Sequence, residues 1–141
     1  MAKARSESDP EFEVAFYENI LKTSPNFIEA LMALGDLYTK QGSYQKGLAV
    51  DEKLAELRPD NATVQYNLAC SYSLMNDVAM ARAAMRRAFA LGYDDLPHLE
   101  KDPDLLNLLA DSDFAEDLKA ARARSVKKIR TKARSESGEN V

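Results

Sequence analysis

Hydrophobic residues recur along most of the chain three or four positions apart, which is the spacing of a helix and not the alternation of a strand. The spacing is clearest in three successive stretches. These contain Val14, Tyr17, Ile20 and Leu21, then Leu31, Leu34, Leu37 and Tyr38, then Leu48, Leu54 and Leu57. No segment has the pattern of a strand, so the chain is predicted to be all-α.

Turn-forming residues separate the helical stretches and predict five helices of about 12 to 15 residues, joined by short turns. The turns are Ser24-Pro25-Asn26, Gln41-Gly42-Ser43, Arg58-Pro59-Asp60-Asn61, Met75-Asn76-Asp77 and Gly92-Tyr93-Asp94-Asp95. Further along, Asp102 and Pro103 predict the start of a short helix that contains several leucines. Ser112 is predicted to cap a last helix, which begins near Asp113.

Both ends of the chain are polar and lack apolar spacing. We therefore predict disordered tails at residues 1–10 and from Ser135 to Val141. The predicted organisation is an N-terminal tail (1–10), a helical domain (11–118), and a basic helix with a C-terminal tail (119–141). A hexapeptide, Lys-Ala-Arg-Ser-Glu-Ser, occurs at residues 3–8 and again at 132–137, and the sequence suggests no role for it.

The helical pattern repeats with a period of 34 residues. Shifting the chain by this period places Leu34 on Leu68, Gly35 on Ala69, Tyr38 on Tyr72, Gly47 on Ala81, Ala49 on Ala83, Leu57 on Leu91 and Asp60 on Asp94. With these residues the chain resembles the tetratricopeptide repeat family over roughly residues 12–95. The resemblance also rests on Leu31, Gly42, Tyr44 and Pro59 in the first repeat, and on Tyr66, Ala88 and Leu91 in the second.

The resemblance implies a right-handed superhelical stack of antiparallel helix pairs, with about two and a half repeats and capping helices from Asp102 onward. The residues expected to pack the repeats are Leu34, Gly35, Tyr38, Gly47, Pro59, Leu68, Ala69, Tyr72, Ala81 and Ala88. Two positions depart from the family pattern. Asp51 stands where a large apolar residue is usual, and Tyr93 stands where a proline is expected. A buried unpaired carboxylate is costly, so Asp51 is expected either to face solvent or to have a basic neighbour.

The sequence contains no recognisable catalytic or cofactor site. Cys70 has no basic residue three or four positions away to activate it, and a single cysteine cannot form an internal disulfide. His98 is predicted to lie in a linker without a second histidine, and the carboxylates do not follow a cation-loop spacing. We therefore expect no enzymatic activity, no metal and no cofactor. No apolar run is long enough for a bilayer and residues 1–13 do not resemble a signal peptide, so we expect a cytoplasmic protein without a membrane partner.

Repeats of this family bind a peptide or helix of another protein in the groove formed by the first helix of each pair. The resemblance therefore implies a protein partner, and helical spacing indicates which side chains face the groove. The nominated residues are Met32, Asp36, Thr39, Lys40, Tyr66, Asn67, Cys70, Ser73 and Leu74. One subset of the family clamps a C-terminal carboxylate with cationic residues on successive helices. Only Asp36, Lys40 and Asn67 stand at the corresponding face here, so that partner is disfavoured.

Charge is distributed unevenly along the chain and leaves two alternatives open. Residues 1–118 carry a net charge of −10, whereas residues 119–141 carry +6. An acidic body favours a cationic or neutral ligand. The basic segment could contact nucleic acid, but it has no aromatic residue for base stacking, and the neighbouring acidic block can satisfy the same charges, so nucleic acid is disfavoured. Self-association through an incompletely capped end of the stack is the other alternative.

Overall fold

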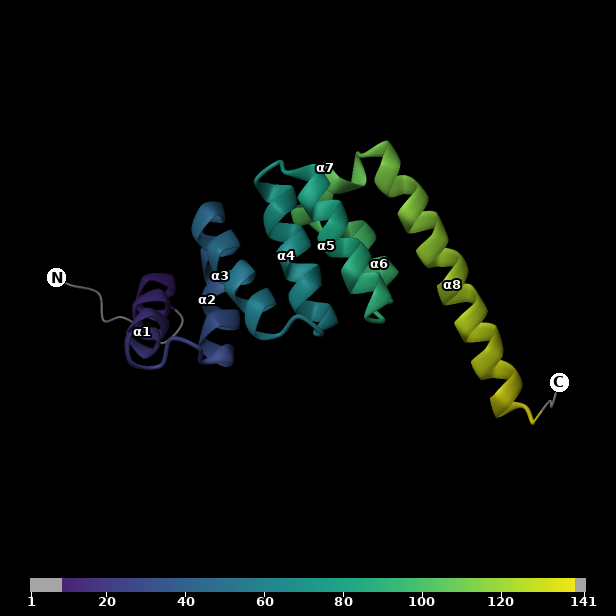
Figure 1. The fold of residues 1–141 in the computed structure, drawn as a ribbon, viewed down its shortest axis with the longest axis horizontal. Helices are drawn as coiled ribbons and strands as arrows, with labels where there is room; N and C mark the ends of the chain where they lie inside the picture. Colours follow the sequence, from purple (N-terminus) through teal and green to yellow (C-terminus); the bar gives the residue numbers. More distant parts are fainter. Residues whose placement is uncertain (1–8, 139–141) are drawn as a thin grey trace.

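The computed structural model describes residues 9–138, and within that range every regular element is a helix, which confirms the all-α prediction. The helices follow one another across the molecule as a row of pairs, from α1 at one end to α8 at the other (Figure 1). The elements are α1 (Pro10–Thr23), α2 (Ile28–Lys40), α3 (Tyr44–Leu57), α4 (Ala62–Leu74), α5 (Val78–Ala90), α6 (Leu96–Lys101), the 3₁₀ helix η1 (Pro103–Leu105), α7 (Leu106–Leu109) and α8 (Ser112–Glu136).

The 34-residue period extends further than the sequence indicated. Helices α1, α3, α5 and α8 begin at residues 10, 44, 78 and 112, and α2, α4 and α6 begin at residues 28, 62 and 96, so equivalent elements start 34 residues apart. The segment predicted as a cap is therefore a third helix pair. Its first helix is broken into α6, η1 and α7 around Asp102 and Pro103, because proline lacks the N–H that would continue α6.

Two predicted helix boundaries need correction. The linker predicted around His98 is helix α6, which Asp95 caps by accepting a hydrogen bond from the His98 N–H. Helix α8 is capped by Asp111, whose carboxylate accepts from the Phe114 N–H at 3.0 Å, and Ser112 is already its first helical residue. Either carboxylate satisfies a backbone donor that the first turn leaves unpaired.

The residues expected to pack the repeats are buried, with one exception. Pro59 is exposed in the turn between α3 and α4, where its carbonyl accepts from the Gln65 side chain. Its part in the repeat is therefore to form the turn and not to fill the core.

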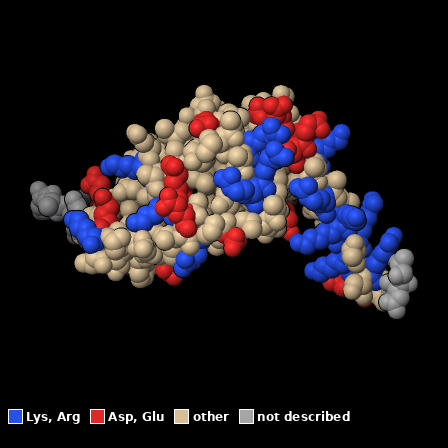
Figure 2. Space-filling view, in the orientation of Figure 1, with Lys and Arg blue, Asp and Glu red and all other residues tan. Residues whose placement is uncertain are grey.

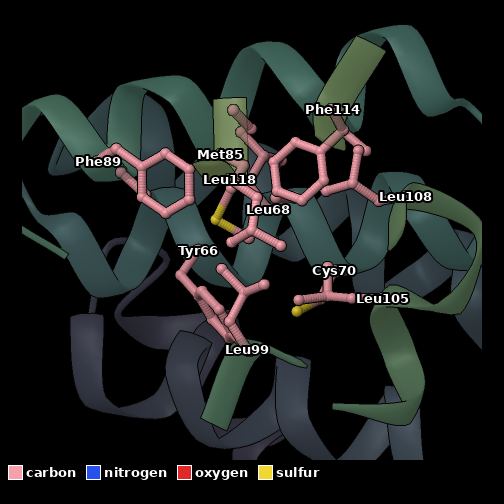
Figure 3. Close-up of a cluster of buried hydrophobic side chains, with 14 of the residues drawn as sticks. Tyr66, Leu68, Cys70, Met85, Phe89, Leu99, Leu105, Leu108, Phe114 and Leu118 are labelled. Carbon is pink, nitrogen blue, oxygen red and sulfur yellow. The ribbon is translucent and has the colours of Figure 1, made fainter. Parts of the chain in front are cut away.

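Apolar burial is concentrated in the second and third pairs (Figure 3). One cluster joins α4 and α5 to the third pair, and its labelled members are Tyr66, Leu68, Cys70, Met85, Phe89, Leu99, Leu105, Leu108, Phe114 and Leu118. A smaller cluster, made of Leu31, Leu54 and Val64, joins the first pair to α4. Helix α1 contributes no buried residue, and its Phe12 and Phe16 are exposed.

Only the first half of α8 packs against the stack; the second half projects from it (Figure 1). Ala121 is the last buried residue of this helix. The predicted tail boundaries shift, since Pro10 opens α1, and Ser135 and Glu136 still belong to α8. Residues 1–8 of the predicted N-terminal tail, which include the first hexapeptide copy, and residues 139–141 lie outside the described residues. None of the helices among residues 9–138 is long and apolar enough to cross a membrane.

Candidate partner-binding groove

The first helices of the three pairs border a pocket of about 210 Å³. Helix α2 forms one wall, α4 forms the floor, and the broken first helix of the third pair forms the other wall. Among the residues nominated from sequence, those that line this pocket are Met32, Asp36, Thr39, Tyr66, Asn67 and Cys70. The other lining residues are Gly35, Asp51, Ser71, His98, Asp102 and Asp104. We call this space the groove pocket.

Three nominated residues lie elsewhere. Lys40 is exposed one turn beyond Asp36 and forms an ion pair with it at 2.8 Å, outside the pocket. Leu74 is half-buried at the end of α4 and is not part of the pocket wall. Ser73 is fully buried, and its hydroxyl accepts a hydrogen bond from the Leu108 N–H at 3.2 Å. The nomination of Ser73 is therefore wrong, because the third pair covers the part of α4 where it lies.

Tyr66 is a fixed wall of the pocket and not a free contact. Its hydroxyl donates to Asp102 Oδ2 at 2.6 Å, and its ring stacks on Tyr93 with a centroid distance of 4.4 Å. Burial and this hydrogen bond raise the pKa of Tyr66, so the hydroxyl remains a donor. Tyr93, the departure from the expected proline, thus packs the third pair onto α4.

Cys70 lies beneath the pocket with little exposure. Its Sγ is 3.8 Å from Asp102 Oδ2. Burial, together with the charges of Asp102 and Asp104, raises the pKa of the thiol, which keeps it protonated and a poor nucleophile. Within the part of the chain that the structure describes, no group of three His, Cys, Asp or Glu side chains is arranged to hold a metal ion.

Asp51 meets neither of the two expectations for it. Its side chain is buried, and its partner is a neutral hydroxyl, because Ser71 Oγ donates to Asp51 Oδ2 at 2.5 Å. Desolvation raises the pKa of Asp51 to about 6 even though this hydrogen bond opposes the shift. Its Oδ1 would lie only 3.0 Å from a Cβ added at Gly35. The sequence placed Asp51 in the repeat but could not identify Ser71 as its partner, because the two residues are on different helices.

Some basic side chains of helix α8 form ion pairs with other helices and turns of the molecule. Arg122 pairs with Glu100, Lys128 pairs with Asp94 at 3.0 Å, and Asp117 of the same helix accepts from Arg82 at 2.6 Å. Figure 2 nevertheless shows that the projecting half of α8 is predominantly basic on its surface. The acidic and basic segments of the sequence therefore attract each other along α8 as far as Lys128, and the cations beyond Lys128 are exposed.

Comparison with known proteins supports the repeat assignment. The model of the tetratricopeptide repeat family matches residues 28–61 and 62–91, which are the α2–α3 and α4–α5 pairs. The chain is also similar to a chloroplastic protein from Arabidopsis thaliana, with 35% identity over 80 residues. That match covers 55% of this chain and 24% of the relative, so the chain spans about a quarter of the protein it resembles.

Proposed function

Because residues 28–91 of this chain match the tetratricopeptide repeat family, we propose that it is a non-catalytic adaptor that binds a peptide or helix of a partner protein in its concave groove. Repeats of this kind use extended concave surfaces for binding. The proposed place of action is the cytoplasm, where a free thiol such as that of Cys70 stays reduced.

The observation that supports this proposal is that the groove stays open while the neighbouring core is covered. The third pair buries the apolar surface of α4 and α5. No element among the described residues covers the face of α2 that borders the groove pocket. There Met32 keeps 37% of its surface exposed beside Asp36 and Thr39. A partly apolar, partly polar wall suits a peptide whose side chains have both characters.

The contacts at the rim also disfavour the carboxylate-clamp mode. Lys40 is the one nominated cation of the groove, and Asp36 holds it in an ion pair. A C-terminal carboxylate would have to compete with Asp36 for that ammonium and would lie close to the other carboxylates of the pocket. We therefore propose an internal segment of the partner as the ligand.

Site-specific photo-crosslinking tests the groove. A benzophenone amino acid is placed at Met32, and a matched control carries it at Ala49, which is exposed on α3, the second helix of its pair. In lysate of the source organism, we expect a discrete protein adduct from position 32 and none from position 49. The adduct should be lost with Asn67→Arg, which fills the groove pocket with a long side chain. Equal labelling from both positions would contradict the proposal.

The projecting half of α8 supports a second candidate function, contact with nucleic acid. Its exposed cations could neutralise phosphates, although the ion pairs to Asp94 and Glu100 already occupy two of the cations of α8. Filter binding of the full chain to single- and double-stranded DNA and RNA at two salt concentrations separates the two candidates. Salt-sensitive retention that disappears when residues after Ser125 are removed would favour this second function over the groove.

A further inference from the structure

The groove pocket is negatively charged, and its own lining does not neutralise it. Four carboxylates line it, those of Asp36, Asp51, Asp102 and Asp104. The lining contains no lysine or arginine, and its basic side chain is His98, which is 3.6 Å from Asp102. Lys40 pairs with Asp36 from outside. An uncompensated charge inside a partly enclosed space attracts a cation more strongly than one on an open surface.

Hydrogen bonds fix some of these carboxylates and leave others available. Both oxygens of Asp102 are used, since Oδ2 accepts from Tyr66 and Oδ1 from the Asp104 N–H at 3.0 Å. Asp51 is tied to Ser71. Among residues 9–138, by contrast, no side chain or backbone group is a hydrogen-bond or ion-pair partner of the half-buried Asp104 carboxylate. Asp36 is exposed, and its partner is the equally exposed end of Lys40.

The negative charge of the groove pocket also affects the pKa of Asp104. Burial raises the pKa of Asp104, and the charges of Asp102 and Asp36 raise it further. The carboxylates of the pocket therefore repel one another, and a positive group placed between Asp36 and Asp104 would relieve that repulsion. The described residues offer no ligand set for a metal ion, so the chemistry favours an organic cation.

We propose that the groove pocket receives the cationic head of a lysine or arginine side chain presented by the partner, held between the carboxylates of Asp36 and Asp104. This inference rests on the proposed groove function and specifies the chemistry of its ligand. The volume of about 210 Å³ corresponds to about seven water molecules, which is room for a guanidinium group and part of its stem. Met32 lies on the same wall of the pocket as Asp36 and can cover the methylene groups of that stem.

A peptide pair that differs in a single charge tests the proposal. The probe is a short, end-blocked glycine–serine peptide with one central arginine, and its control carries citrulline, which has the same shape without the charge. Each is titrated into the full-length, ¹⁵N-labelled chain at low ionic strength. We expect saturable amide shifts around Asp36 and Asp104 with the arginine peptide and none with the citrulline peptide.

Variants assign the effect to the two carboxylates. Asp36→Asn and Asp104→Asn should each weaken binding of the arginine peptide roughly fivefold. Lys40→Gln should strengthen it roughly twofold, because it removes a competing cation. Asp60→Asn is the matched control, since Asp60 is an exposed carboxylate in a turn outside the pocket, and it should have no effect.

The proposal is overturned if the citrulline peptide produces the same shifts, if the shifts of the arginine peptide map away from the pocket, or if Asp60→Asn weakens binding as much as Asp104→Asn. Failure of the peptide titration together with a specific adduct from position 32 would remove the cation preference and leave the adaptor function standing. Failure of both experiments would remove both proposals.

Discussion

The stack has two seams between successive helix pairs, and they are built differently although their backbones follow one period. The first seam joins α3 to α4, and there Asp51 accepts a hydrogen bond from Ser71. The second seam joins α5 to the third pair, and the residues 34 positions further along are Met85 and Leu105, both fully buried in the large apolar cluster. A polar pair in one seam is thus replaced by an apolar pair in the other.

The two seams thus have the same backbone arrangement but different side-chain chemistry. The second seam buries the side chains of Figure 3 and exposes none of its central residues. The first seam rests on the small cluster of Leu31, Leu54 and Val64, and its Asp51 also lines the groove pocket. The second seam therefore supplies most of the apolar stabilisation, whereas the first places charge beside the proposed binding surface.

Truncating one leucine in each seam should give the largest effects and should separate the seams. Leu105→Ala is expected to cost about 4 kcal/mol of unfolding free energy, because Leu105 is fully buried in the larger cluster, where a cavity is hard to close. Leu54→Ala, with the same loss of atoms, is expected to cost about 2–3 kcal/mol, since half-buried neighbours such as Val50 and Leu57 can relax into the space. Urea denaturation followed by circular dichroism measures both, and equal losses would contradict the comparison.

Replacing Asp51, the buried carboxyl group of the first seam, should change the stability of the protein by an amount that depends on pH. The folded-state pKa of Asp51 is about 6, above its ordinary value of 3.8, so the folded state binds the proton more tightly. Stability should therefore fall as pH rises from about 4 to about 6 and stay lower above that, by about 2–3 kcal/mol. Asp51→Asn should remove this dependence and be the more stable protein at pH 7.5.

The measurement for Asp51 is a set of urea denaturation curves at pH 4.5 and 7.5 for both proteins. Ser71→Ala is a useful companion, because it removes the hydrogen bond and keeps the buried carboxyl. It should be destabilising at both pH values. If the stability difference between the wild-type protein and Asp51→Asn were the same at both pH values, Asp51 would not titrate as a buried carboxyl group.

Removing the projecting half of α8 should have the smallest effect. A chain that ends at Ser125 keeps Phe114, Leu118 and Ala121, the buried residues of this helix, and loses the exposed Lys128–Asp94 pair. The expected cost is below about 1 kcal/mol. Thermal unfolding of the shortened and full chains measures it. A much larger loss would mean that the second seam depends on residues beyond the ones that the structure buries.

The sequence predicts much of this architecture because turn residues and the 34-residue period act locally. Helices α1 to α5 were predicted, and the family model matches the two full repeats that the same period predicts. Helix α6 was missed although Asp95 and Pro97 form the same start signal as Asp102 and Pro103. Its six residues are too few to show helical periodicity.

The groove was harder to predict because its residues depend on contacts between helices. Helical spacing placed Met32, Asp36 and Asn67 at the pocket, since all three face outward from their own helices. It also selected Ser73, which has the right spacing but lies where the third pair docks. Asp102 and Asp104 also line the pocket, but the residue spacing of α2 and α4 could not predict this. These two residues come from the third pair, whose first helix is interrupted at Pro103.

The close approach of Gly35 and Asp51 restricts the order in which this protein can accumulate mutations. A methyl group at position 35 would lie 3.0 Å from Asp51 Oδ1 and 3.4 Å from a Val50 methyl group, so alanine there disturbs a buried carboxylate. Once Asp51 is replaced by a smaller residue, that contact disappears. Alanine at position 35, the residue that position 69 already carries in the second repeat, is thus expected to be less costly after position 51 has changed. The two sites form an epistatic pair, in which the order of the two substitutions determines the cost of the one at position 35.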